Sequence, residues 1–170
     1  NMKLYRFSPI KNKEELMHAI KYLHKTSFEL CFKVLGKYLP EAENLGIFCH
    51  YDQEFNFLKE IQTEITCEPD KYNDKYLILK ELLEFKKEDE IPGAKYKFFY
   101  VRRPDPYRHH VGDIDFVVSK EEFDKLKSMK KTGLRYIQKL DMIELYDPDF
   151  DVLVYLSPLM WNERINLRRE

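Results

Sequence analysis

Residues 109–128 read HHVGDIDFVVSKEEFDKLKS, and this stretch decides the fold. In its first half, side chains of opposite polarity alternate, which predicts a strand over residues 111–119. Its second half begins with Ser119 and has Glu122 three positions later, which predicts a capped helix over residues 120–129. The stretch therefore opens a unit in which a helix follows a strand directly.

The same order of elements occurs twice in the chain. After the helix, strands are expected over residues 134–140, 142–146 and 152–156. The turn DPDFD separates the last two. The preceding part of the chain predicts the same order: a strand over residues 45–50, a helix over 52–61, and strands over 65–68, 76–85 and 96–103. The turn PDKYND separates the first two of these three strands. This internal repeat predicts two βαβββ modules over residues 41–110 and 111–158, and a C-terminal tail over 159–170.

The first forty residues predict helices. Asn12 followed by Glu15 resembles a capping box, and Gly36 and Pro40 end the helical run. Ser27 indicates a break between two helices inside an apolar stripe with a period near 3.6 residues: Leu16, Ile20, Leu23, Cys31, Val34 and Tyr38. The expected fold is therefore α+β, with a helical segment over residues 1–40 packed on a mixed sheet that forms a trough.

Composition excludes several classes of function. The 170 residues carry 29 basic and 30 acidic side chains, so a general nucleic-acid-binding role is not expected. No apolar run approaches the roughly 18 residues of a membrane span, and the N-terminus lacks the features of a secretory signal. Cys31, Cys49 and Cys67 show no CxxC spacing, which favours reduced thiols in a cytoplasmic protein.

The paired modules resemble the vicinal oxygen chelate superfamily, which includes glyoxalases and extradiol dioxygenases. Three strings carry the resemblance: residues 109–128, DMIELYDPDFDVLVYLS over residues 141–157, and NLGIFCHYDQEFNFLKEI over residues 44–61. Within the superfamily, the chain looks most like the YecM-like proteins, which carry helices ahead of the paired modules. The resemblance implies a small-molecule site in the trough and a divalent metal there, such as Zn, Mn, Ni or Fe.

The residues at the superfamily's ligand positions depart from its pattern. The resemblance matches the first-strand histidine to Asn44 and Asp113, and the fourth-strand glutamate to Arg102 and Val154. Of these four, only Asp113 is a good metal ligand, and a guanidinium cannot coordinate a cation. The usual set of histidines and glutamates is therefore missing.

An alternative metal site can be assembled from nearby residues. Asp113 and Asp115 share one face of their strand with Cα atoms about 7 Å apart. This pair could hold a hard cation together with His50 or His109. Alternatively, both carboxylates are solvated or pair with neighbouring arginines.

The residues expected to hold a ligand are basic and aromatic. Tyr96, Phe98, Tyr100 and Arg102 alternate along one strand and should share the trough face, near Asn44. Arg102 and Lys80 could together receive a carboxylate or a phosphate, with the rings stacking on a planar ligand. Alternatively, the rings pack in the core and the two cations pair with acidic neighbours.

Two functions therefore compete. The first is a metal-dependent enzyme of the lyase, isomerase or oxygenase type, with its metal at His50, Asp113, Asp115 or His109. The second is a metal-free binding module for an anionic small molecule held by Arg102 and Lys80. No GxSxG or GxGxxG motif is present, so no catalytic residue is assigned.

Overall fold

The computed structural model describes residues 4–69, 77–159 and 163. In chain order, the elements within them are α1 (Lys13–Leu35), β1 (Ala42–Phe48), α2 (Asp52–Ile65), β2 (Leu77–Phe85), β3 (Ala94–Arg102), β4 (Gly112–Val117), α3 (Lys120–Lys127), β5 (Leu134–Ile137), β6 (Met142–Leu145) and β7 (Val152–Ser157). The strands form one mixed sheet in the order β2-β3-β1-β4-β7-β6-β5. The predicted α+β class is therefore confirmed.

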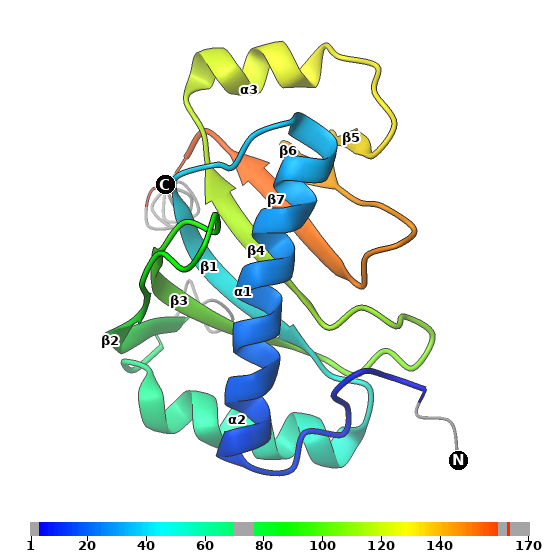
Figure 1. The fold of residues 1–170 in the computed structure, drawn as a ribbon. Coiled ribbons are helices and arrows are strands. Elements are labelled where there is room, and N and C mark those ends of the chain that lie inside the picture. Colours follow the sequence, from blue (N-terminus) through cyan, green and yellow to red (C-terminus); the bar gives the residue numbers. More distant parts are fainter. Residues whose placement is uncertain (1–3, 70–76, 160–162, 164–170) are drawn as a thin grey trace.

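The opening strands of the two repeats, β1 and β4, lie side by side at the middle of the sheet (Figure 1) and run antiparallel. In each repeat, the last strand returns beside the first and parallel to it, β3 beside β1 and β7 beside β4. The remaining strands extend the sheet on both sides. The repeat inferred from the sequence thus corresponds to two units arranged around one antiparallel pair.

The first unit has one strand fewer than predicted within the described residues. Helix α2 continues to Ile65, beyond its expected end at residue 61, and the strand expected over residues 65–68 is reduced to a single bridge between Thr66 and Leu79. The turn expected over residues 69–74 lies outside the described residues except for its first position, as does most of the expected C-terminal tail.

Helix α1 is one continuous helix. Its start is capped as predicted, because Asn12 Oδ1 accepts a hydrogen bond from the Glu15 amide at 2.8 Å, and it ends at Gly36 with a φ of 76°. The predicted break at Ser27 is wrong. Ser27 is fully buried against the sheet, and its hydroxyl has no hydrogen-bond partner in the part of the chain that the structure describes. Tertiary packing here outweighs the low helix propensity of serine.

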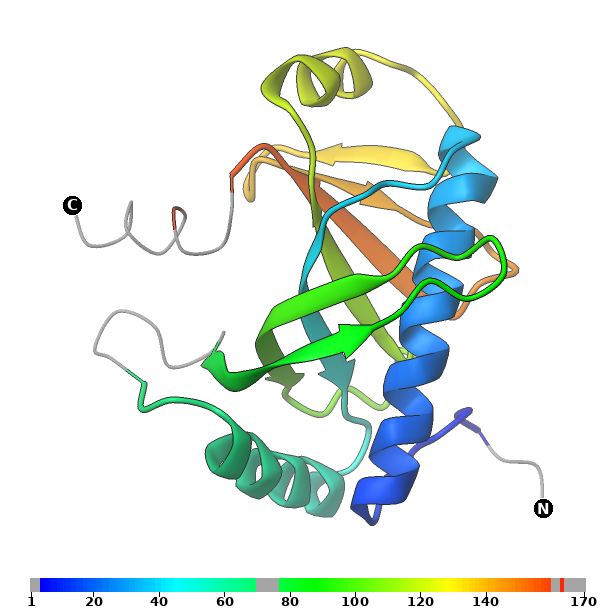
Figure 2. The same ribbon diagram turned by 60° about the vertical axis from the view of Figure 1, so that its left-hand side comes forward.

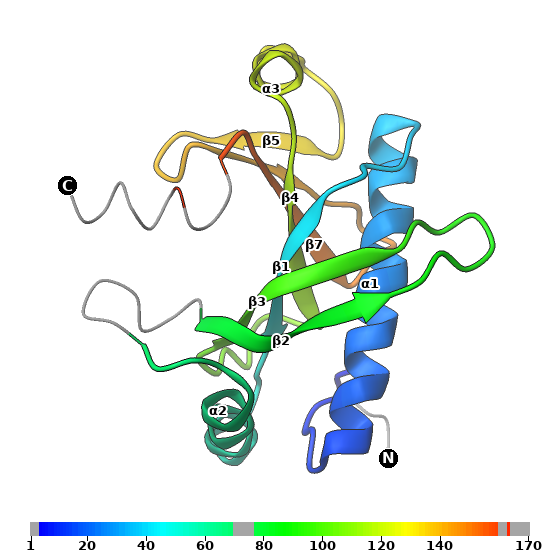
Figure 3. The same ribbon diagram turned by 90° about the vertical axis from the view of Figure 1, so that its left-hand side faces the viewer.

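The three helices cover one face of the sheet. Figure 3 shows α1 along the middle of this face, with α2 and α3 near its two ends. The Phe28 ring of α1 packs edge-on against Phe116 of β4, with ring centroids 5.0 Å apart. The β2–β3 hairpin crosses α1 (Figure 2), and the Phe85 ring stacks on His24 at 4.4 Å. These contacts place the main core between the helices and the sheet. No helix in the described ranges is long and apolar enough to cross a bilayer.

The opposite face of the sheet is concave. Phe98 of β3, Met142 of β6 and Tyr155 of β7 form one small apolar cluster on it. Three strands lie between β3 and β6, so a flat sheet would separate these two by roughly 19 Å. The cluster can form only because the sheet curls toward this face. We call this concave face the trough.

Candidate functional site

A row of polar side chains crosses the middle of the trough. Its members are register partners on neighbouring strands: Asn44 of β1, Asp115 of β4, Tyr155 of β7 and Glu144 of β6. The Asn44 amide donates a hydrogen bond to the Asp115 carboxylate, and the Tyr155 hydroxyl donates to Glu144 at 2.8 Å. Glu144 also accepts from Arg135. Burial and the Glu144 carboxylate raise the pKa of Tyr155, so its hydroxyl stays protonated.

The next row along the strands joins Tyr100, Gly46 and Asp113. Both flanking residues pair with Gly46, from β3 and β4 respectively. A Cβ atom on Gly46 would lie 2.3 Å from Asp113 Oδ1 and 3.1 Å from Tyr100 Cδ1, so the glycine makes room for both side chains. Burial and the Asp113 carboxylate raise the pKa of Tyr100 to about 12.

Arg102 lies one row further, at the end of the trough. Its Cζ atom sits 3.5 Å from the centroid of the Phe48 ring, which is its register partner on β1. Nε and Nη2 are buried and have no hydrogen-bond partner among the described residues. Burial, followed by the Arg108 guanidinium, lowers the pKa of Arg102, while Asp105 and Asp113 raise it. The sequence placed Arg102 in the trough, and the structure agrees.

Arg103 lies on the other face, where its Cζ is 6.0 Å from the Phe55 ring of α2. The alternation predicted for the end of this strand is therefore present, and Arg103 is a natural control for Arg102.

Tyr96 does not lie in the trough, and that part of the prediction is wrong. Its hydroxyl and His24 Nδ1 of α1 lie 2.7 Å apart in a hydrogen bond, so Tyr96 belongs to the core under the helices. Tyr96 and Phe98 are two positions apart yet lie on opposite faces, so strict alternation fails here, at the point where the β2–β3 pairing jumps from Ile78–Phe98 to Leu83–Tyr96.

Lys80 does not join Arg102 either. Its exposed ammonium group donates to the Glu64 carbonyl oxygen in the last turn of α2, at 3.1 Å. Because α2 is longer than predicted, its end offers Lys80 a partner on the side of the sheet that the helices cover.

The four residues expected to bind a metal are divided between two places. Asp113 and Asp115 lie in the trough, where they are 8% and 5% exposed. His50 lies beyond the end of β1, with Nδ1 2.7 Å from Ser8 Oγ and its ring stacked 3.9 Å from Tyr5. His109 is exposed in the turn before β4. Within the described residues, no group of three or more His, Cys, Asp or Glu side chains is arranged to hold a metal ion.

The surroundings of His50 show why it is fixed there. Glu54, at the start of α2, accepts hydrogen bonds from the backbone amides of His50 at 2.8 Å and Ile10 at 2.6 Å. The Ser8 hydroxyl lies between the His50 ring and Glu54, 3.0 Å from the carboxylate. These contacts tie the N-terminal segment to α2, and they give His50 a role in the fold.

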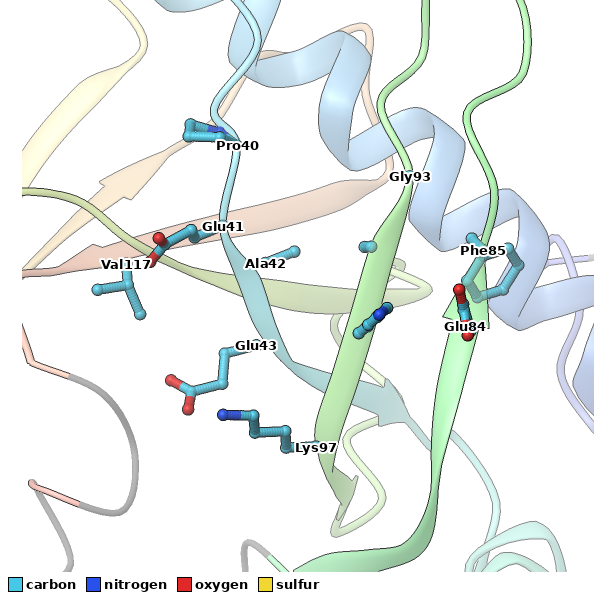
Figure 4. A pocket seen from close by; sticks show the side chains of 11 residues that line it. Pro40, Glu41, Ala42, Glu43, Glu84, Phe85, Gly93, Lys97 and Val117 are labelled. Carbon is cyan, nitrogen blue, oxygen red and sulfur yellow. The ribbon is translucent and has the colours of Figure 1, made fainter.

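A separate cavity of about 410 Å³ opens where β1 and β3 diverge, before their first paired residues. An extra residue in the β1–β4 pairing, Glu43, sits at this point and is 5% exposed. Figure 4 shows the Glu43 carboxylate and the Lys97 ammonium group directed toward one another across the cavity. Both acidic and basic side chains line it: Glu41, Glu43, Glu84, Lys95 and Lys97.

Several residues of the trough were missed by sequence reasoning. Phe48 shares a face with Asn44, and this alternation could have identified it. Tyr155 was missed because the hairpin before β7 was aligned one residue off. The prediction matched Val154 to the trough, whereas Val154 is fully buried in the main core and Tyr155 faces Glu144.

Comparison with known proteins bears on the fold alone. No family model matches the chain, and no curated protein matches it. The chain is similar to a solved structure described as "Structural Genomics, Protein EC4020", with a TM-score of 0.57, 11% sequence identity and 98% of each chain covered. This likeness extends over the helices and the curled sheet together.

Proposed function

We propose that this protein binds a small anionic molecule at the Arg102 end of the trough. The observation that carries the proposal is the state of the guanidinium: Nε and Nη2 are buried, and no described residue accepts a hydrogen bond from them. Leaving a buried donor unsatisfied costs about 1–3 kcal/mol, and more for a charged group. A carboxylate or phosphate oxygen supplies the acceptor that such a donor requires.

The neighbours of Arg102 suit this role. The Phe48 ring contacts the guanidinium with its centroid 3.5 Å from Cζ, and this contact restricts the side chain before a ligand binds. Asp113 and the Tyr100 hydroxyl lie in the adjacent row and can contact the uncharged part of a ligand. Lys80 has no part in the proposed site because it is held by α2.

The arrangement also supports a relation to the vicinal oxygen chelate superfamily. Two units placed around a central antiparallel pair, with a trough between them, are what the resemblance implies. A metal-dependent activity stays a prediction, because its expected ligands lie in two separate places.

The proposal can be tested by thermal unfolding in the presence of acetate or phosphate at constant ionic strength. A ligand at a hundred times its Kd adds about 2.7 kcal/mol to the free energy of unfolding. For a chain of this length, 1 kcal/mol shifts Tm by about 2–4 °C, so the expected rise is about 5–11 °C.

The matched variants decide the result. Arg102→Ala should lose the rise in Tm, whereas Arg103→Ala, on the face toward α2, should keep it. The proposal is wrong if acetate and phosphate both leave the wild type unchanged, or if the two variants respond equally.

A further inference from the structure

The cavity where β1 and β3 diverge lies at the opposite end of this strand pair from Arg102. Pairing between the two strands begins at Asn44 and Phe98 and ends at Phe48 and Arg102, four residues further along. At about 3.3 Å per residue, roughly 13 Å of paired strand separates the cavity from the row of Arg102. The cavity is therefore distinct from the proposed anion site.

Two strand edges form the sides of this cavity. Residues 42–43 of β1 and 94–97 of β3 precede the first residues that the two strands pair with one another in the described chain. The outer edges are paired there, Ala42 with β4 and Ala94 with β2. The inner edges therefore present backbone amide and carbonyl groups to the cavity, which suit a ligand that carries both donors and acceptors.

Glu43 supplies the buried acidic group of the cavity. It is the extra residue in the β1–β4 pairing, and a bulge of this kind bends its strand and redirects a side chain. Glu43 lines the cavity although it is only 5% exposed. A carboxylate has about four lone-pair sites, so it can accept from a ligand as well as from the protein. Because a carboxylate is costly to remove from water, a ligand that brings an ammonium group is favoured here.

Lys97 supplies a basic group on the other side of the cavity. Its side chain is exposed, and Figure 4 shows its ammonium group directed toward the Glu43 carboxylate. None of the ion pairs within the described residues joins these two groups. The Lys97 ammonium group therefore keeps donors for an anionic group of a ligand.

A ligand that suits both groups carries one charge of each sign. Glu43 repels a simple anion, and Lys97 repels a simple cation. We propose that this cavity is a second binding site, for a free α-amino acid with an apolar side chain, whose ammonium group is held by Glu43 and whose carboxylate is held by Lys97.

The size and the remaining lining of the cavity agree with such a ligand. Its volume of about 410 Å³ lies at the lower end of the range for small-molecule sites, roughly 300–1,000 Å³. The apolar part of its lining can receive an apolar side chain: Pro40, Ala42, Phe85, Ala94 and Val117.

The test is isothermal titration calorimetry with L-alanine, L-valine, L-leucine and L-phenylalanine at constant ionic strength. A pH of 6.5 keeps an α-amino group charged, because its ordinary pKa is about 7.7–8.0. At least one of the four should bind with a Kd of about 1 mM or lower. For the tightest binder, the amide lacks the carboxylate and the deamino acid lacks the ammonium group. Each of these analogues should bind at least about tenfold more weakly.

Three variants assign the binding to this cavity. Glu43→Gln should weaken binding at least about tenfold, because it removes a buried charge that contacts the ligand. Lys97→Met should weaken it about fivefold, as expected for an exposed charge, and should no longer distinguish the amino acid from its amide. The folded state should survive this replacement of an exposed side chain. Lys33→Met, an exposed position on α1, is the control and should bind as the wild type does.

A titration of Arg102→Ala separates this proposal from the proposed function. It should give the wild-type affinity for the amino acid. Loss of binding in Arg102→Ala would place the amino acid in the trough, which would overturn the second site and support the anion site. The second site is also overturned if none of the four amino acids binds, if the amide binds as tightly as the amino acid, or if Lys97→Met and Lys33→Met respond equally.

Discussion

Replacing Gly46 with alanine tests the packing in the trough with a single methyl group. The new Cβ would lie 2.3 Å from Asp113 Oδ1 and 3.1 Å from Tyr100 Cδ1. Carbon–oxygen contacts are ordinarily about 3.3 Å or longer, so the Asp113 carboxylate must retreat by roughly 1 Å. Asp113 is 8% exposed, which leaves it little room to do so.

The expected cost follows from two opposing terms. Overpacking a close-packed region costs about 1–3 kcal/mol, and replacing glycine inside a strand recovers about 0.5–1 kcal/mol of chain entropy. With the middle of each range, about 2 and about 0.75 kcal/mol, the net loss should be about 1–2 kcal/mol in the free energy of unfolding. For a chain of this length, that lowers Tm by about 2–8 °C.

A double-mutant cycle with Asp113→Ala shows whether the cost arises from this contact. Urea denaturation of the four proteins should give a coupling energy of about 1 kcal/mol, because the methyl group has room once the carboxylate is removed. Gly112→Ala is the control: its Cβ would lie 2.1 Å from the Gly46 carbonyl oxygen, a backbone atom. It should be more destabilising, and by the same amount in both backgrounds. If Gly46→Ala and Asp113→Ala are additive within about 0.5 kcal/mol, the packing described for the trough is wrong.

Three further predictions concern α1. Ser27→Ala should stabilise the protein by about 1 kcal/mol in urea denaturation, because a buried hydroxyl without a described partner is removed, and a loss of stability would contradict this. Phe28→Ala should cost about 3–5 kcal/mol, because the ring is fully buried against Phe116; a cost below about 1 kcal/mol would make α1 an appendage. Burial lowers the pKa of His24 to about 4 from 6.5, so the unfolded chain takes up this proton first, and stability should fall as the pH drops from 6.5 toward 4. His24→Gln should make the free energy of unfolding less dependent on pH across that window, and an unchanged slope would contradict the assignment.

The order of elements could be predicted because each element has its own local pattern. The Ser119 cap and Gly36 mark helix ends at the places the structure shows. Alternation of apolar and acidic side chains placed Asp113 and Asp115 on the trough face, and Arg102 and Arg103 on opposite faces.

The errors arose where a residue's surroundings depend on distant parts of the chain. Alternation assumes a regular strand, and Tyr96 lies under the helices at the point where the β2–β3 pairing is irregular. The partner of Lys80 depends on how far α2 extends, which local patterns place only within a few residues.

The most direct test of the central claim follows the Arg102 guanidinium itself while an anion is added. Two-dimensional proton–nitrogen NMR resolves the Nε–H resonances of arginine side chains, and Arg102→Ala identifies the one that belongs to Arg102. During titration with sulfate, this resonance should shift saturably, while the Arg103 resonance stays in place. Saturable sulfate binding that leaves the Arg102 resonance unmoved would contradict the account, because the ligand would then occupy another site.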